Sequence, residues 1–230
     1  MEALKIVALG DSLTVGYLSP VTGLEWPPYR PYTRFLEEMI RDAIAKKRKN
    51  IRLQVINKGL NGDLTESMVN RFDRDALLLN PSHIIILGGT NDIGWGIPVS
   101  EIYSHLKEMY DKTIHLSIKL TACAVPSILG YDSLIPPRLR LNEMIRRYCE
   151  AKGANYVDLF SATVDPATQR LSSKYSNDGL HLNAEGYRRL AETIFKDAFL
   201  PLINAPARSK NLRGPTCPAK CDQAQATPNE

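Results

Sequence analysis

Cysteine is scarce in this sequence and lacks the usual spacings. The 230 residues include four cysteines, and no two of them are spaced C-x-x-C. Four cysteines do not make a disulfide framework in a chain of this size. The nearest pair, Cys217 and Cys221, has no histidine beside it, so we expect no metal site there. Cysteine usage leaves the redox compartment open.

Long apolar runs are also absent. The first run, Ile6 to Leu9, is far shorter than a signal-peptide core and leads directly into a Gly-Asp turn. No later run approaches the roughly 20 apolar residues of a membrane span. We therefore expect a soluble protein without integral membrane contact, and a cytoplasmic one unless a leader precedes this sequence.

Neither sign of charge dominates. The 29 Lys and Arg against 25 Asp and Glu give a net charge of +4, and part of that excess follows Asn204. A nearly neutral folded part without a basic stripe indicates a small-molecule substrate and no nucleic-acid partner. The sequence does not determine the oligomeric state.

The chain does have enough apolar residues for one core. Hydrophobic residues make up 43% and charged residues 23%, close to the average for globular proteins. A domain of this size buries about 70–75% of its unfolded surface and needs no metal or disulfide. We place that domain at residues 1–203. Residues 204–230 contain four prolines and no apolar periodicity, so we interpret them as a flexible tail.

Short β-rich runs alternate with longer segments of helical period. This alternation is typical of an α/β fold, in which helices cover both faces of a parallel sheet. The predicted strands are Leu4 to Leu9, Arg52 to Ile56, His83 to Leu87, Leu116 to Ala124 and Asn155 to Leu159. The predicted helices are Tyr32 to Lys47, Leu64 to Leu79, Val99 to Asp111, Pro137 to Ala151 and Ala184 to Leu200. Asn183 is the expected N-cap of the last helix, and Pro201 is expected just beyond its end.

Small polar clusters follow the first three predicted strands, and a fourth cluster follows the fifth. They are Gly10-Asp11-Ser12-Leu13, Gly59-Leu60-Asn61-Gly62-Asp63, Gly88-Gly89-Thr90-Asn91-Asp92 and Asp178-Gly179-Leu180-His181. The carboxyl ends of parallel strands share one edge of the sheet, so these clusters are expected to meet in one crevice. Two long connections, Gly16 to Pro31 and Pro126 to Pro136, are expected to form its walls.

The clusters contain a serine and the residues that could activate it as a nucleophile. A hydroxyl needs a neighbouring base, and that base needs a group that orients it. His181 is the one histidine in a Gly- and Asp-rich loop. Asp178, three residues earlier, can turn back to one ring nitrogen and leave the other facing Ser12. We therefore expect Ser12, His181 and Asp178 to form a catalytic triad.

Acyl transfer also needs donors for the charge that develops on the carbonyl oxygen. The candidates are the backbone N–H groups of Ser12 and Gly62 and the side-chain amide of Asn91. Glycine at position 62 lets the backbone approach the substrate closely. We expect the neighbouring aspartates to hold turns by hydrogen bonds; these are Asp11, Asp63 and Asp92.

The four blocks GDSL, GLNGD, GGTND and DGLHLN resemble those of the SGNH superfamily of GDSL lipases and esterases. The match in order and spacing extends over roughly residues 4 to 200. The resemblance implies a three-layer, flavodoxin-like sandwich with five parallel strands in the order 2-1-3-4-5. It also implies Ser12 as nucleophile, Gly62 and Asn91 in the oxyanion hole, and His181 with Asp178 completing the triad, with no metal or organic cofactor.

The expected activity is hydrolysis of carboxylic esters with short to medium acyl chains through an acyl-enzyme. Sugar O-deacetylation, thioester or lysophospholipid hydrolysis and a non-catalytic binding module are the alternatives, because specificity lies in the loops. A dinuclear metal phosphoesterase is disfavoured, because only one histidine is well placed. Trp26, Tyr29 and Tyr32 of the first loop line the substrate pocket or anchor the loop, and Tyr131 of the second favours an apolar acyl group.

Overall fold

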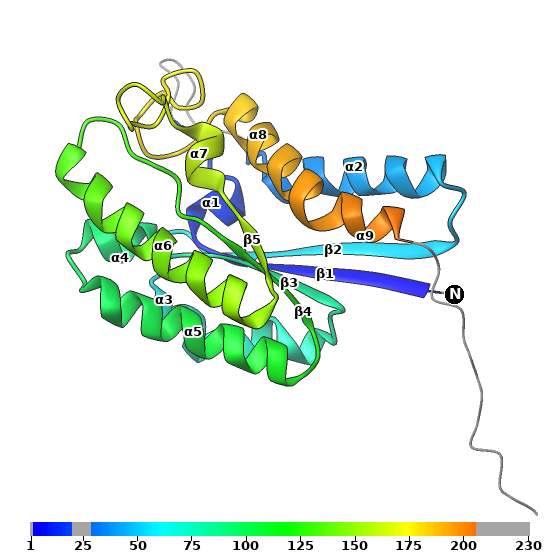
Figure 1. The fold of residues 1–230 in the computed structure, drawn as a ribbon. Coiled ribbons are helices and arrows are strands. Elements are labelled where there is room, and N and C mark those ends of the chain that lie inside the picture. Colours follow the sequence, from blue (N-terminus) through cyan, green and yellow to red (C-terminus); the bar gives the residue numbers. More distant parts are fainter. Residues whose placement is uncertain (1, 20–28, 206–230) are drawn as a thin grey trace, which may run out of the picture.

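Five strands pair in parallel in the order β2-β1-β3-β4-β5 (Figure 1). The computed structural model describes residues 2–19 and 29–205. The strands are β1 (Glu2–Gly10), β2 (Ile51–Gly59), β3 (His83–Leu87), β4 (Lys119–Cys123) and β5 (Asn155–Val157). The predicted α/β class and strand order are confirmed.

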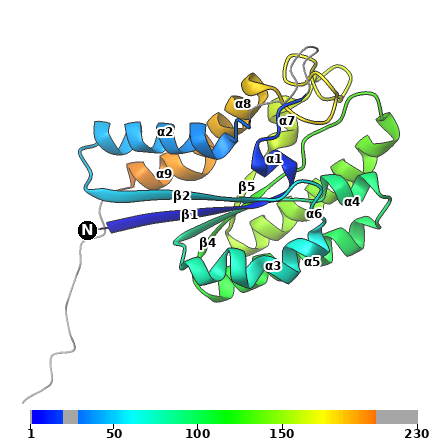
Figure 2. The same cartoon turned by 180° about the vertical axis from the view of Figure 1, so that it is seen from behind.

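Helices cover both faces of the sheet. One face carries α2 (Tyr32–Lys46), α8 (Ala184–Ile194) and α9 (Leu200–Asn204), and the other carries α3 (Thr65–Asp75), α5 (Val99–His115) and α6 (Ile135–Lys152) (Figures 1 and 2). Alternate residues of the central strand feed the two cores. Ile6 packs beneath α2 and α8, whereas Val7 packs toward α3 and α5. The sheet is therefore buried on both sides, as the apolar strands require.

The strand register brings the candidate residues to one edge. Gly10 pairs with Gly59 on one side and with Leu87 on the other, so β1, β2 and β3 end level. Three short helices, which the sequence did not predict, begin just beyond the strands. They are α1 (Ser12–Val15), α4 (Thr90–Gly94) and α7 (Leu159–Thr163). All four polar blocks therefore follow the carboxyl edge of the sheet or lie beside it.

Two predicted strands are too long. The helix before β4 continues to His115, and Ser117 then takes a positive φ of 59°, so β4 begins at Lys119 rather than at Leu116. The last strand ends at Val157 because Asp158 caps α7, its side chain accepting from Ser161 N at 2.9 Å. Local capping hydrogen bonds therefore outweigh the apolar pattern at both places.

Two predicted helices end differently. The third helix stops at Asp75 and is followed by a 3₁₀ turn, Leu77–Leu79, instead of continuing as α-helix. The last helix begins at its predicted cap, Asn183, but continues through a π-helical turn, Phe195–Phe199, into α9. Pro201 thus lies inside α9 rather than beyond the helix. It occupies the first turn, where a proline removes no needed donor.

Asn204 is the last residue of α9. Residues 206–230 lie outside the described part, and their flexibility stays a prediction. No helix in the described ranges is long and apolar enough to cross a membrane.

Candidate active site

Ser12 is the first residue of α1 and directly follows Gly10 and Asp11 at the end of β1. Asp11 caps this helix, its Oδ1 accepting from Leu13 N at 2.9 Å. Ser12 is only 7% exposed. Its backbone N–H belongs to the first turn of the helix, where backbone donors have no intrahelical partner. The local fold therefore leaves a hydroxyl and an N–H donor together at the edge of the sheet.

Asp178 and His181 share a tight turn. Asp178 Oδ2 lies 3.0 Å from His181 Nδ1, and its Oδ1 accepts from the backbone N–H groups of Leu180 and His181 at 2.9 and 2.8 Å. Burial alone would raise the pKa of Asp178, but the hydrogen bonds from the His181 ring and the two N–H groups outweigh it and hold that pKa below its usual value. An ionised Asp178 accepts the Nδ1 proton, so Nε2 of His181 is left as the base.

Gly179 lets this turn contact the loop after β4. Its φ is +84°, and a Cβ at this position would lie 2.4 Å from Leu129 O. Leu129 N donates to Gly179 O at 2.9 Å. Any larger residue here would push the two loops apart. The position of the Asp-His turn therefore depends on the loop that follows β4.

The nucleophile and histidine segments run side by side. Ser19 N donates to Leu182 O at 3.0 Å, and Tyr187 Oη donates to Tyr17 O at 2.6 Å. The Tyr17 ring meets the His181 ring edge-on, with centroids 4.7 Å apart. Within the described ranges no hydrogen bond joins Ser12 Oγ to His181. Tyr17 instead links the two, because its own N–H donates to Ser12 O at 3.1 Å.

The two expected oxyanion donors flank one turn. Gly62 has a φ of +73°, and no atom lies within 4 Å of the position that a Cβ would take. The space beside its backbone is open. Asn91 Nδ2 donates to Asp63 O at 2.9 Å, so one amide hydrogen orients the side chain and the second remains for a ligand. The turn is also tied to the nucleophile strand, because Leu60 N donates to Gly10 O at 2.9 Å.

A buried arginine holds this turn in place. Arg71 Nη2 lies 2.7 Å from Asp63 Oδ2, and the side chains are only 6% and 5% exposed. The guanidinium also donates to Lys58 O at the end of β2 and to Gly10 O at the end of β1. Burial raises the pKa of Asp63, with Arg71 opposing it. Asp92 plays a similar role, because both carboxylate oxygens accept from Thr65 N.

Sequence reasoning missed Tyr17 and Arg71. Tyr17 follows Gly16 directly after the nucleophile helix, and an aromatic residue at that point was the available signal. Arg71 had no signal of its own, since an arginine in an amphipathic helix is usually solvated. Only the fold shows that it faces inward.

The predicted substrate-binding residues differ in their surroundings. Trp26 lies outside the described residues. Tyr29 is exposed and packs edge-on against Tyr17, with centroids 6.2 Å apart, so it stands one ring away from His181. Tyr131 is exposed in the loop after β4. Tyr32 is fully buried at the start of α2 and anchors the loop rather than lining a pocket.

The described residues hold no group of three or more His, Cys, Asp or Glu side chains suited to a metal ion. This edge of the sheet instead presents a hydroxyl, an imidazole oriented by a carboxylate, and neutral N–H donors. These are the parts that acyl transfer uses.

The family model of the GDSL-like lipase/acylhydrolase family matches residues 8–189, a span that includes all four blocks. The chain belongs to this family. The search of curated proteins finds no match. The chain is an acylhydrolase by family, of the esterase and lipase type.

Solved structures share the fold of this acylhydrolase. A lipase/acylhydrolase from Enterococcus faecalis is 27% identical with a TM-score of 0.65, and the match covers 84% of this chain and 94% of that one. An acetyl-xylooligosaccharide esterase from Geobacillus stearothermophilus, crystallised as a mutant, is 16% identical with a TM-score of 0.71, covering 89% and 95%. A GDSL-like lipase from Bacteroides thetaiotaomicron is 18% identical with a TM-score of 0.62, covering 84% and 86%.

We predict that Arg71→Leu lowers the free energy of unfolding by about 3–5 kcal/mol, because it leaves the buried Asp63 without its partner. Arg74→Leu is the matched control. Arg74 hydrogen-bonds Asp75, which Arg71 also contacts, but its side chain is 71% exposed. This variant should keep nearly the stability of the wild type, because a substitution at an exposed surface position has little effect. Urea unfolding of both variants measures the difference. Equal losses of unfolding free energy would show that the buried Arg71–Asp63 pair does not stabilise the fold.

Asp11 generates a pH-dependent prediction. Burial raises the pKa of Asp11 to about 7 from 3.8. Between these values the folded chain keeps a proton that the unfolded chain has lost, so stability falls as the pH rises through this window, by up to about 4 kcal/mol, and is flat above it. In Asp11→Asn this contribution is absent. Urea unfolding at pH 5 and pH 8 should therefore show that the stability of Asp11→Asn relative to the wild type is higher at pH 8 than at pH 5. A gap that is equal at both pH values contradicts the assignment.

Proposed function

We propose that this acylhydrolase cleaves carboxylic esters of short to medium acyl chains through an acyl-enzyme on Ser12. The observation that carries the proposal is the 3.0 Å contact of His181 Nδ1 with Asp178, on a turn fastened to the segment that follows Ser12. It leaves Nε2 as a base at the edge where the nucleophile lies. The proposed catalytic residues are therefore Ser12, His181 and Asp178.

The proposed reaction has two steps. In the first, Ser12 Oγ attacks the ester carbonyl and its proton passes to His181 Nε2. The N–H groups of Ser12, Gly62 and Asn91 receive the developing oxyanion. The intermediate then expels the alcohol, which takes the proton from His181. In the second, water attacks the acyl group, His181 accepts and returns a proton, and the carboxylic acid leaves with Ser12 restored.

The proposed preference for an alkyl acyl chain is inferred from the loop that follows β4. The loop after β4 brings Leu129 against the Asp178–His181 turn, and Ile128 packs with Phe160 and Leu180 in a small apolar cluster. Ile128 and Phe160 are buried, so the preference for an alkyl chain over a sugar is inferred from the partly buried Leu129 beside the turn.

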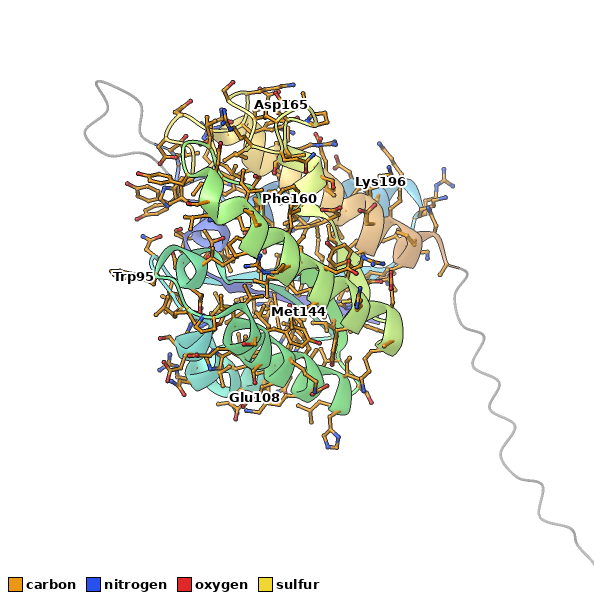
Figure 3. The ribbon with its side chains drawn as sticks, turned by 60° about the vertical axis from the view of Figure 1, so that its left-hand side comes forward. Trp95, Glu108, Met144, Phe160, Asp165 and Lys196 are labelled. Carbon is orange, nitrogen blue, oxygen red and sulfur yellow. The ribbon has the colours of Figure 1, made fainter. Side chains whose placement is uncertain are left out.

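A carbohydrate O-deacetylase is the second candidate. Aromatic side chains stand exposed on segments that follow the carboxyl edge: Tyr29, Trp95 and Tyr131. Trp95 is 79% exposed and caps α4, four residues after Asn91. Figure 3 shows it projecting away from the body of the molecule. Exposed aromatic faces suit the stacking of a sugar ring as well as an acyl chain.

We expect the wild type to hydrolyse p-nitrophenyl esters, with an optimum among the shorter chains of a series from acetyl to palmitoyl. Ser12→Ala should lose about 10⁴-fold or more in kcat, because no other proposed nucleophile accepts the acyl group. A serine-directed organophosphate should label Ser12, as mass spectrometry of the peptide would show.

Each other outcome selects another function. Cleavage of acetylated xylo-oligosaccharide or of acyl thioesters without cleavage of p-nitrophenyl esters would favour those substrates. No turnover together with no adduct on Ser12 would favour a non-catalytic binder and overturn the proposal.

We predict that Asn91→Ala lowers kcat by about 10²–10³-fold, because it removes an oxyanion donor. Asn61→Ala is the matched control, an exposed asparagine of the same sheet edge without an assigned role, and should leave kcat unchanged. Initial rates on the best p-nitrophenyl ester measure both. A wild-type kcat in Asn91→Ala would show that the Asn91 side chain is not an oxyanion donor.

A further inference from the structure

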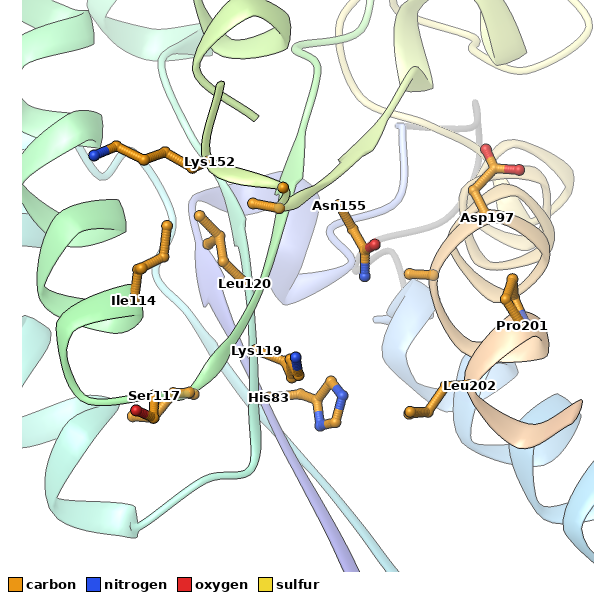
Figure 4. Close-up of a pocket in the computed structure, with 14 residues that line it drawn as sticks. His83, Ile114, Ser117, Lys119, Leu120, Lys152, Asn155, Asp197, Pro201 and Leu202 are labelled. Atoms are coloured by element: carbon orange, nitrogen blue, oxygen red, sulfur yellow. The ribbon is translucent and has the colours of Figure 1, made fainter. Parts of the chain in front are cut away.

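A second cavity lies at the opposite edge of the sheet. It has a volume of about 480 Å³ and is lined by the first residues of three neighbouring strands, His83, Lys119 and Asn155. Figure 4 shows these side chains facing the space between the strands and the segment of residues 195–204. The catalytic residues follow the carboxyl ends of the strands, so this cavity is separate from the crevice.

His83 contributes a ring nitrogen to this cavity. The residue is only 8% exposed, and its Nδ1 lies 3.1 Å from Ser82 Oγ. Ser82 Oγ donates its own proton to Lys5 O, so it accepts from Nδ1, and Nε2 is left as an acceptor. In the described part of the chain Nε2 has no hydrogen-bond partner. This nitrogen is accessible from the cavity, so a ligand there can lie against it.

Lys119 places a cation beside this ring. His83 and Lys119 are register partners on adjacent strands, so both side chains project from the same face. Burial lowers the pKa of His83 to about 4, and the Lys119 charge adds to the effect. The ring is therefore neutral at pH 7. Lys152 and Asp197 also border the cavity, and with Lys119 they leave one net positive charge.

The far wall is a π-helical turn. Phe195–Phe199 forms this turn and carries Asp197 and Ala198 to the cavity, while Pro201 and Leu202 of α9 continue the wall. Single π turns inside helices are rare and occur often at functional sites. Here the wide turn and the proline supply an apolar surface opposite the polar strand ends.

We propose that this cavity binds a small amphiphilic carboxylic acid. Its carboxylate oxygens accept from Lys119 and the Asn155 amide, beside the neutral His83 ring. Its apolar part lies on Ala198, Pro201 and Leu202. One negative charge matches the single net positive charge of the lining. An acid released by ester hydrolysis belongs to this class, but the site does not depend on that reaction.

Octanoate is the probe, and the ring resonances of the four histidines are the readout. His83→Gln identifies the His83 resonance by its loss. We expect octanoate to move this resonance saturably and to raise the pKa of His83, because the anion offsets Lys119. Octan-1-ol, with the same chain and no charge, should leave it in place. Lys119→Met should weaken binding about tenfold, the loss of one charge-assisted contact.

Lys196→Met is the matched control, an exposed lysine of the same π turn (Figure 3) that does not line the cavity. It should bind octanoate as the wild type does. A His83 resonance that octanoate never moves, even while that of His181 responds, would place binding in the catalytic crevice alone and overturn the proposal. Equal affinity of Lys119→Met and the wild type would overturn it as well.

Discussion

The geometry of the crevice depends on one buried guanidinium. Arg71 of α3 reaches the last residue of β1, the end of β2 and the carboxylate of Asp63 in the turn that carries Gly62. The side chains of Arg71 and Asp63 are only 6% and 5% exposed, so the loss of one partner would leave a buried charge unpaired. The spacing between the Ser12 turn and the Gly62 turn is therefore set by a side chain that lies outside the proposed triad and oxyanion hole.

The histidine side of the crevice is built differently. Asp178 and His181 are three residues apart, and the turn between them satisfies its own hydrogen bonds through Ser176 Oγ and Asp178 Oδ1. Such a turn forms locally and needs only to be placed. Placement comes from the segment after Ser12, which forms hydrogen bonds with Leu182 and Tyr187 and sets the Tyr17 ring edge-on against the imidazole. Long-range contacts thus position a preformed acid-base pair.

The sequence was informative where a residue's role follows from its neighbours along the chain. The strands, the four polar blocks and the Asn183 cap were predictable, because periodicity and capping are local. The strand order followed from the resemblance to the GDSL family. Arg71 and the buried His83 were not, since burial of a polar side chain depends on the helix or strand that covers it. The prediction at Pro201 was wrong for another reason. Proline ends a regular helix, but the π turn before it starts a new helical segment in which Pro201 occupies the first turn.

Burial also controls charge beneath the nucleophile. Thr65 satisfies Asp92 and Arg71 pairs with Asp63, but Asp11 Oδ2 has no partner in residues 2–19 and 29–205. The buried Arg138 offers only long-range attraction, and burial lowers its own pKa to about 10. Asp11 is therefore neutral below a pH of about 7. A carboxylate adjoining Ser12 would oppose the proposed oxyanion. Below a pH of about 7 the fold therefore keeps the hydrogen bond that caps α1 without placing a negative charge beside Ser12.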